Sequence, residues 1–411
     1  MRKNAVIKTL TPIDGGVTAP AGFSLYQTHA NLNRAGTAGQ NDAALLFADR
    51  RYPVARVFTD CSLVSADITQ TKTRLKIGKA QSVLLHTAPT FSTPDALKAS
   101  KQTALLIAEK TGCDYDDTLI LSHGKLLGSY RYVELSNAVT KLGQKVKKRD
   151  ILSLLNMQPQ PQNAFFHQTA YAFELGAFTC KIGAAFCCTS SKISDPVGFT
   201  CILTTDVCIE NTMLQKALSS AVADTVALTD FGAEASPCDA VCILASGKAQ
   251  NAKIDCADLE YKKFCDVLKR ALRTICRLAL TVSNPNRPLL TCNVSGSPSI
   301  TSARAVAGAI IRSKALQACF MLGEVDPDRV VCTVGSAYNT IRLDKAEITL
   351  KTEKGEIILL DLGRTSTFPP ERTKEILSSE EIELNVRFND GNYRAIGQTA
   401  LMTASEITCA K

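Results

Sequence analysis

The chain has 411 residues, of which 45% are hydrophobic and 21% are charged, and its formal net charge is +8. This balance is typical of a globular protein with one large or two medium domains and excludes a disordered chain. Aromatic residues make up only 6% and tryptophan is absent, which argues against a nucleic-acid surface built on base stacking. The basic cluster Lys145–Asp150 is typical of a solvated helix end.

No uncharged apolar run approaches the roughly 18 residues that a membrane span requires, and the first residues lack the apolar core of a signal peptide. We therefore expect no membrane contact and a cytoplasmic location. The 16 cysteines include no CxxC pair, and only four histidines are present, so the sequence predicts no metal site and no cofactor. Most of the cysteines are expected to be buried free thiols; the adjacent pair Cys187 and Cys188 is either strand filler or a redox-sensitive thiol.

The first half of the chain alternates between predicted strands and helices. The segment Gly15–Phe23 predicts a loop that leads into a strand. Ser92 or Thr93, before Pro94, is the expected cap of the first helix. The predicted strands begin at residues 42, 54, 82 and 118, and the predicted helices cover residues 96–111 and 133–144.

A polar linker, Met157–Asn163, separates this half from the next. Short strands are expected up to residue 186 and again at 239–247, with helices at 210–226, 258–280 and 302–313. The break Ser283–Pro288 divides two predicted domains, 1–282 and 283–411. The last part is predicted to be rich in strands, at Leu289–Gly296, Val330–Ser336, Ala346–Thr352, Glu356–Leu362 and Ile382–Phe388. Because the helices and strands do not alternate strictly, the pattern favours an α+β fold over a doubly wound one.

Several motifs along the chain match one family. They are GGVTAPAGF at Gly15–Phe23, VARVFTD at Val54–Asp60, the Leu-Thr-Thr-Asp run at Leu203–Asp206 and the helical stretch Ala307–Ser313. In these segments the chain resembles the ornithine acetyltransferases, also called bifunctional glutamate N-acetyltransferases, of arginine biosynthesis. The resemblance covers nearly the whole chain. It implies an α-β-β-α sandwich with helices outside two central sheets, together with a smaller α/β C-terminal domain.

The family cuts its own chain before a threonine, and the freed threonine becomes the catalytic nucleophile. Counting back from Leu203–Asp206, the residues at the two sides of that bond are Val197 and Gly198. Glycine has no side-chain oxygen, so it can neither attack its own backbone nor carry an acyl group. The resemblance therefore implies a degenerate member without self-cleavage at this bond.

Other positions implied by the resemblance also depart from the family. His123 and Gly124 fall at the oxyanion hole, where His123 either donates a hydrogen bond or is a loop histidine in solvent. Cys187 replaces a substrate-holding lysine, with Lys192 nearby but off register, and Asn284 replaces a glutamate. Thr408 or Cys409 stands where the family has an asparagine. Glu234, Ser236 and Asp239 remain in register with the family, and Glu234 and Asp239 are interpreted as structural turn residues.

These losses predict a catalytically inactive, uncleaved homologue with a binding, scaffold or regulatory role. It would bind a small N-acyl amino acid and form a homo-oligomer, or a hetero-oligomer with an active relative. One alternative is an acyltransferase or amidohydrolase that acts on N-acyl amino acids through Cys187. Thr200, Cys201 and Ser194 are also near, but a shift of two residues along a strand moves an atom about 6.6 Å. The other alternative is residual glutamate N-acetyltransferase activity.

Overall fold

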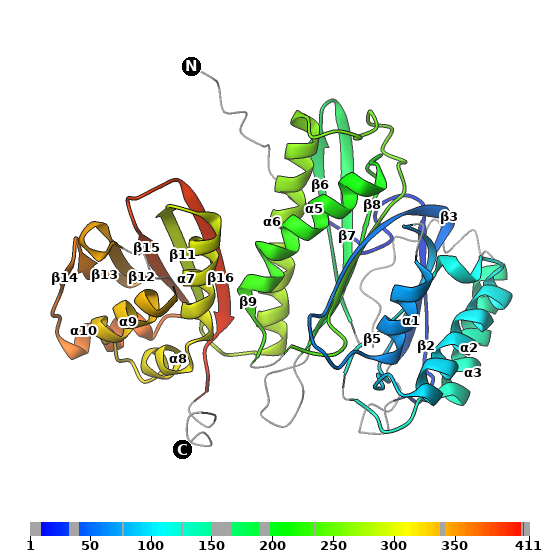
Figure 1. Cartoon of the computed structure of the whole chain (residues 1–411), viewed down its shortest axis with the longest axis horizontal. Helices are drawn as coiled ribbons and strands as arrows, with labels where there is room; N and C mark the ends of the chain where they lie inside the picture. The colour runs from blue at the N-terminus through cyan, green and yellow to red at the C-terminus, as the bar shows by residue number, and fades with distance from the viewer. Residues whose placement is uncertain are drawn as a thin grey trace. The chain divides into compact units, whose positions relative to one another are not determined.

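The computed structural model describes residues 10–32, 41–75, 78–124, 126–148, 166–188, 198–232, 235–337, 342–403 and 406. These residues form two compact units (Figure 1). The first contains the described residues up to 188 together with 198–222 and 235–275, and the second contains 223–232 and those from 276 onwards. The change between the units at 275 and 276 falls inside a helix, and the division at residue 283 stays a prediction.

A mixed sheet forms the centre of the first unit. Its strand order among the described residues is β1-β6-β7-β8-β10-β3-β4-β5, and β2 also pairs with β3. The strands are β1 (Thr11–Ile13), β2 (Phe23–Thr28), β3 (Ala43–Phe58), β4 (Lys79–His86), β5 (Thr118–Ser122), β6 (His167–Leu175), β7 (Phe178–Cys188), β8 (Phe199–Thr205) and β10 (Ala240–Ala245).

Strand β3 belongs to two layers of this sheet. Its first part pairs with β2 and β4, and its last part pairs with β10. The pairing with β4 changes register between Phe47 and Tyr52, next to Pro53, which has no N–H to donate. The sequence predicted two strands here, whereas the structure has one strand of 16 residues.

The two layers face each other across an apolar core. Leu46, Leu85 and Leu121 from the layer of β3, β4 and β5 form one cluster with Ile202 and Cys242 from the layer of β8 and β10. Helices α2 (Pro94–Thr111) and α3 (Tyr132–Lys148) pack on the outer face of the first layer. Helices α5 (Asn211–Ala223) and α6 (Leu259–Ser283) lie against the other layer (Figure 1). The predicted α-β-β-α sandwich is therefore confirmed.

Helix α1 (Ala66–Arg74), which the sequence did not predict, closes the free edge of β5. The hydroxyl of Ser65 caps its first turn by accepting the N–H of Ile68. The hydroxyl of Thr71 accepts the N–H of Ile120 and donates to the carbonyl of the same residue, at 3.1 Å in each case. One side chain thus satisfies both backbone groups of Ile120 on the edge of the sheet that no strand covers.

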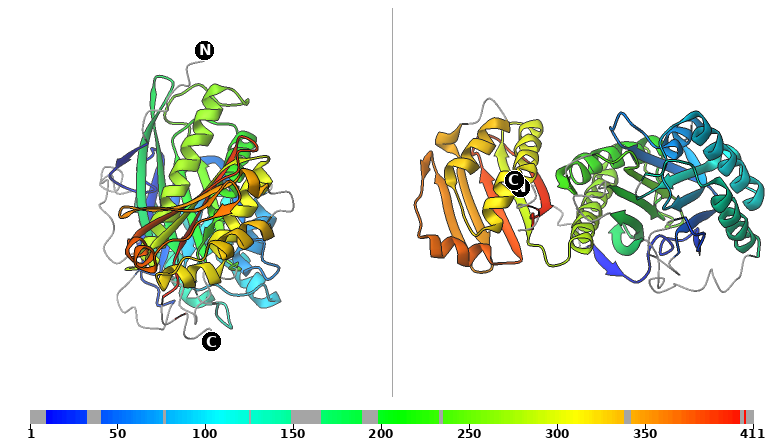
Figure 2. Two further views of the ribbon diagram at one scale, coloured as in Figure 1. Left: turned by 90° about the vertical axis from the view of Figure 1, so that its left-hand side faces the viewer. Right: turned by 90° about the horizontal axis from the view of Figure 1, so that it is seen from below.

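The second unit is a sheet covered on one face by helices. Its strand order is β14-β13-β12-β15-β11-β16-β9 among the described residues. The strands are β9 (Thr229–Asp230), β11 (Leu289–Ser297), β12 (Glu347–Thr352), β13 (Gly355–Asp361), β14 (Arg364–Thr365), β15 (Glu381–Arg387) and β16 (Tyr393–Ala400). Helices α7 (Ile300–Arg312), α8 (Lys314–Met321), α9 (Pro327–Ala337) and α10 (Pro370–Leu377) lie on the same side of this sheet (Figure 2).

The predicted strand Val330–Ser336 is wrong, because these residues lie in helix α9. Val330 and Val334, four residues apart, are both fully buried against the core of the second unit. A short apolar run does not reveal its period, and here Pro327 opens a helix. The other predicted helices are confirmed as α2, α3, α5, α6 and α7, and Thr93 is the cap of α2.

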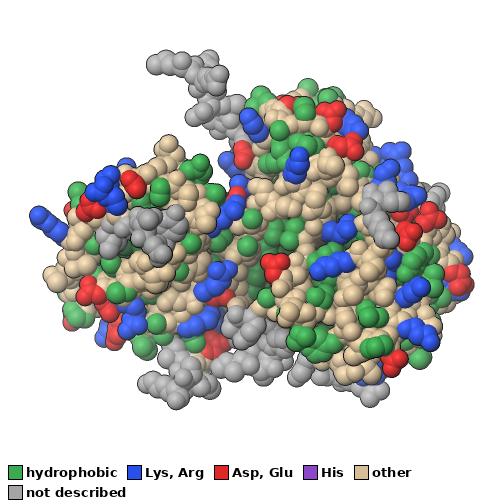
Figure 3. All heavy atoms as spheres, viewed as in Figure 1, with side chains coloured by type: hydrophobic (Ala, Val, Ile, Leu, Met, Phe, Trp, Pro, Cys, Tyr) green, Lys and Arg blue, Asp and Glu red, His purple; other side chains and the backbone are tan. Residues whose placement is uncertain are grey.

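None of the helices formed by the described residues combines the length and the hydropathy needed to cross a lipid bilayer. Lys and Arg side chains are scattered among Asp and Glu on the face shown in Figure 3. The positive balance of the chain is therefore not gathered into one patch on that face.

Candidate functional site

Gly198 directly precedes β8, the strand that lies between β7 and β10. Cys187 on β7 is paired with Thr200 on β8, and Cys187 and Ile202 both belong to the core between the layers. Because side chains alternate along a strand, Gly198 and Thr200 face that same interior. The residue that the family resemblance aligns with the nucleophile therefore lies directly before β8 and faces the interior between the layers.

The space beside Gly198 is filled by Ser236. A Cβ placed on Gly198 would lie 2.9 Å from both Cβ and Oγ of Ser236, and 3.2 Å from Oδ1 of Asp239. Real Cβ atoms do not approach a neighbour that closely, and Ser236 is itself 7% exposed. No side chain of any kind fits at position 198 unless the serine moves.

Asp239 links the start of β8 to the segment that contains Ser236 through hydrogen bonds. Its Oδ1 accepts the N–H of Phe199 at 2.7 Å, and its Oδ2 accepts the N–H of Ser236 at 3.1 Å. The Ser236 hydroxyl in turn accepts the N–H of Cys238 at 3.2 Å. Burial raises the pKa of Asp239 to about 6, although both N–H donors favour the carboxylate. These contacts agree with the structural role predicted for Asp239; Glu234 lies outside the described residues.

His123 is buried, so the alternative of a loop histidine in solvent is wrong. Its Nδ1 lies 3.2 Å from the hydroxyl oxygen of Thr200, and that hydroxyl also lies 3.4 Å from the carbonyl oxygen of Cys238. Burial lowers the pKa of His123 to about 4, so the ring is neutral at physiological pH. Its Nε2 is buried and has no partner among the described residues. The structure thus joins a neutral imidazole to a hydroxyl two residues after Gly198.

Gly124 follows with a φ of +123°, a conformation that other residues adopt only with strain. A Cβ at this position would approach only the carbonyl oxygen of Thr87, at 3.5 Å. Backbone conformation, rather than lack of space, therefore explains the glycine at the predicted oxyanion-hole position.

Cys187 is a buried thiol with a raised pKa. The residue is 2% exposed, and burial, followed by the neighbouring Cys188, raises its pKa far above the ordinary value. A nucleophilic cysteine needs a thiolate, which a site of this kind disfavours. The environment of Cys187 therefore does not favour the alternative in which it carries the acyl group.

The remaining predicted site residues are not brought to Gly198 by any described contact. Asn284 follows α6, where its Nδ2 donates to the carbonyl of Leu280 at 3.0 Å, as the end of a helix requires. Thr408, Cys409, Lys192 and Val197 lie outside the described residues. Ser236 was missed as a neighbour of Gly198 because the two are 38 residues apart in sequence (236 − 198) and nothing local links them. No group of three or more metal-ligating side chains occurs in the described part of the chain.

Comparisons with known proteins agree with the motifs. The model of the ArgJ family matches residues 25–408. The chain is 24% identical over 396 residues to the arginine biosynthesis bifunctional protein ArgJ of Caldanaerobacter subterraneus subsp. tengcongensis, covering 93% of this chain and 94% of that protein. It is 21% identical over 397 residues to the glutamate N-acetyltransferase of Methanocaldococcus jannaschii, with coverage of 93% and 94%.

Among solved structures, the arginine biosynthesis bifunctional protein ArgJ of Bacillus halodurans matches 51% of this chain and 96% of its own, with 20% identity and a TM-score of 0.45. The family assignment rests on the family model, which matches far more than half of the sequence. The predicted family is confirmed: the chain belongs to the ArgJ family.

Proposed function

We propose that this ArgJ-family protein remains one uncleaved chain and does not transfer acetyl groups through residue 198. The relatives named above act in arginine biosynthesis or transfer acetyl to glutamate, and in the related enzymes a threonine at this position supplies the nucleophile. Gly198 has no hydroxyl for an N-to-O acyl shift and none to form an ester. The single observation that carries the proposal is the occupation of that space by Ser236, whose Cβ and Oγ lie 2.9 Å from any Cβ built at 198.

The remaining role of the protein is binding. We assign a small N-acyl amino acid to the end of the sandwich formed by His123, Thr200 and Gly124, where the buried Nε2 of His123 has no partner among the described residues and would form a hydrogen bond with the ligand's amide. A ligand held there without turnover would serve a scaffold or regulatory role. Assembly as a homo-oligomer or with an active relative, and a location in the cytoplasm, belong to the same proposal.

Intact mass spectrometry tests the first part. The purified full chain should give a single species of 44.2 kDa after long incubation at 37 °C. Two fragments that meet between residues 197 and 198 would overturn the proposal. The chain should also fail to rescue an arginine auxotroph, and rescue would show that glutamate N-acetyltransferase activity remains.

A second function is favoured by one contact, that of His123 with Thr200. In this alternative the Thr200 oxygen attacks the carbonyl carbon of an N-acyl amino acid or a reactive ester while its proton passes to Nδ1 of His123. The carbon–leaving-group bond breaks, the leaving group takes that proton, and an ester on Thr200 is left for water or an amine. Thr200 is 1% exposed, as buried as Cys187, so this alternative requires a local opening that admits the substrate. Thr200 is preferred to Cys187 because its hydroxyl has a base at 3.2 Å and needs no free α-amine.

Incubation with p-nitrophenyl acetate followed by peptide mapping separates the two functions. Stoichiometric acetylation of Thr200, lost in Thr200→Val and retained in Thr200→Ser, would establish the second function. Absence of an adduct on Thr200 would exclude it.

A further inference from the structure

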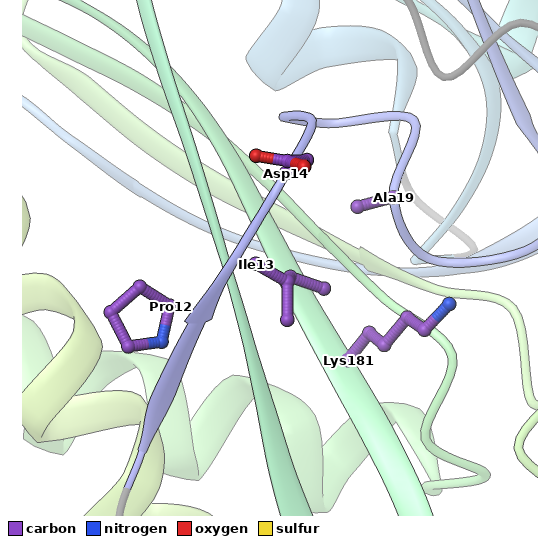
Figure 4. Close-up of a pocket in the computed structure, with 5 residues that line it drawn as sticks. All are labelled: Pro12, Ile13, Asp14, Ala19 and Lys181. Carbon is purple, nitrogen blue, oxygen red and sulfur yellow. The ribbon is translucent and has the colours of Figure 1, made fainter.

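An open cavity of about 520 Å³, with Pro12 and Asp14 exposed at its rim, lies near the end of β8 opposite to Gly198. It is lined by Pro12, Ile13, Asp14, Ala19 and Lys181 (Figure 4). Lys181 is on β7, next to Ile182. Ile182 pairs with Thr205, which is at the end of β8 farthest from Gly198. Seven residues of extended strand between 198 and 205 span roughly 23 Å, so this cavity is separate from the candidate site.

The sheet itself provides the space. In the pairing of β1, β6 and β7, Thr11 is opposite Ala172, and Ala172 is opposite Lys181. Strand β6 lies between β1 and β7, whose backbones are two strand spacings, about 10 Å, apart, and at this level β6 contributes only the methyl group of Ala172 to the face that carries Lys181. Ile13 and Ala19 provide an apolar floor beside this gap (Figure 4).

Two opposite charges border the cavity without pairing with each other. Asp14 is exposed and Lys181 is half-buried, and the two side chains lie on different sides of Ile13 and Ala19 (Figure 4). Asp206 lies next to Lys181, and its Oδ1 accepts the backbone N–H of Lys181 at 2.7 Å. The positive charge of Lys181 also favours the ionised form of Asp206, so the ammonium of Lys181 is attracted both by this carboxylate and by any anion in the cavity.

Hydrogen bonds hold the backbone next to the cavity in place. The hydroxyl of Thr204 donates to the carbonyl of Val17 at 2.8 Å, and the N–H of Val17 donates to the side chain of Gln168 at 3.3 Å. On the other wall, the hydroxyl of Thr205 donates to the carbonyl of Lys181 at 2.8 Å. A preformed site spends little of its binding energy on ordering itself.

We propose that this cavity binds a free α-amino acid. The carboxylate of the ligand would pair with Lys181 and its ammonium with Asp14, and its side chain would lie over Pro12, Ile13 and Ala19. A zwitterion satisfies both charges at once, whereas an N-acyl amino acid has lost the ammonium and an amino acid amide has lost the carboxylate. The site therefore selects against the N-acyl ligand assigned to the other end of the sandwich.

Calorimetric titration of the full chain tests this assignment, with leucine, glutamate and ornithine as free amino acids and N-acetylleucine and leucinamide as blocked probes. At least one free amino acid should bind with a dissociation constant on the order of 1 mM or below, as two partly exposed ion pairs and some apolar contact allow. Both blocked probes should bind about tenfold more weakly than the free amino acid, and added salt should weaken the binding of the free amino acid.

Lys181→Met and Asp14→Asn should each weaken the binding of the free amino acid about tenfold. Lys351→Met and Asp361→Asn are the matched controls, because both residues are exposed in the second unit. Circular dichroism confirms that each variant is folded. Equal affinity for N-acetylleucine and leucine, unchanged affinity in both cavity variants, or no saturable binding of any free amino acid up to about 20 mM would each overturn the proposal. Self-cleavage and acetyl transfer are measured separately, so failure here leaves the proposed function untouched.

Discussion

The side chain of Ser236 lies in the volume that the first carbon of any side chain at Gly198 would need. Replacing Gly198 by alanine should therefore destabilise the first unit by about 1–3 kcal/mol, the usual cost of overpacking a well-filled interior. Urea unfolding measures the loss. Gly128→Ala is the matched control, because a Cβ there meets no atom within 4 Å, and it should be near neutral.

The cause of that loss can be isolated with a double variant. Removing the serine side chain in Gly198→Ala/Ser236→Gly should recover at least half of the loss, after correction for Ser236→Gly alone. Additive effects of the two substitutions would show that Ser236 is not what excludes a side chain at 198.

Asp239 should make the protein more stable as the pH falls from 7 towards 4. Its folded pKa of about 6 lies above the ordinary value of 3.8, so the folded state binds the proton more tightly than the unfolded state does. The buried carboxylate exerts its full destabilising effect above pH 6, and this effect disappears below pH 3.8, the ordinary pKa of the group. The difference amounts to about 1–3 kcal/mol. Urea unfolding at several pH values should show this contribution in the wild type and lose it in Asp239→Asn.

His123 should make the folded protein less stable as the pH falls. Its folded pKa of about 4 lies below the ordinary 6.5, so between these values the unfolded chain binds a proton that the folded chain does not. Stability is lost as the pH falls through this window, and His123→Asn should remove that loss. The imidazole proton resonances of His123, identified by their absence from the same variant, should not move between pH 7.5 and 5.5. Titration of the ring near pH 6.5 would contradict its burial.

Cys187 should resist alkylation in the native protein. Its sulfur is buried and its pKa is raised by that burial, so neither access nor thiolate is available. Cys256 and Cys332 are exposed and provide internal controls. Iodoacetamide followed by peptide mapping should label both exposed residues and leave Cys187 unmodified until the chain is unfolded. Prompt labelling of Cys187 would revive it as a candidate nucleophile.

The parts of the fold that could be predicted are those with a local cause. Helix α2 has a cap at Thr93, Pro94 at its start and apolar residues at helical spacing, all within 19 consecutive residues (93–111). The layered sandwich came from family resemblance, because no periodicity reveals that one strand, β3, serves two layers. Helix α9 was mistaken for a strand because the run Val330–Ser336 is too short to show a period.

The candidate site was predicted only in part, because some of its contacts join residues that are far apart in the sequence. The missing hydroxyl at Gly198 is readable from the sequence, but the contact of His123 with Thr200 joins residues 77 apart on different layers. Burial of His123 depends on that packing, and so does its pKa. Contacts across layers are decided by the tertiary fold, which a single sequence does not encode in any local pattern.

The long strand β3 also determines how cooperatively the two layers of the first unit unfold. Its opening residues are bonded to β2 and β4 and its closing residues to β10, so either layer can loosen only by breaking bonds to a strand that the other layer still holds. Amide protons in the middle of β4 and of β10 should therefore exchange with solvent at a common rate set by one cooperative opening, because a shared strand ties their lifetimes together.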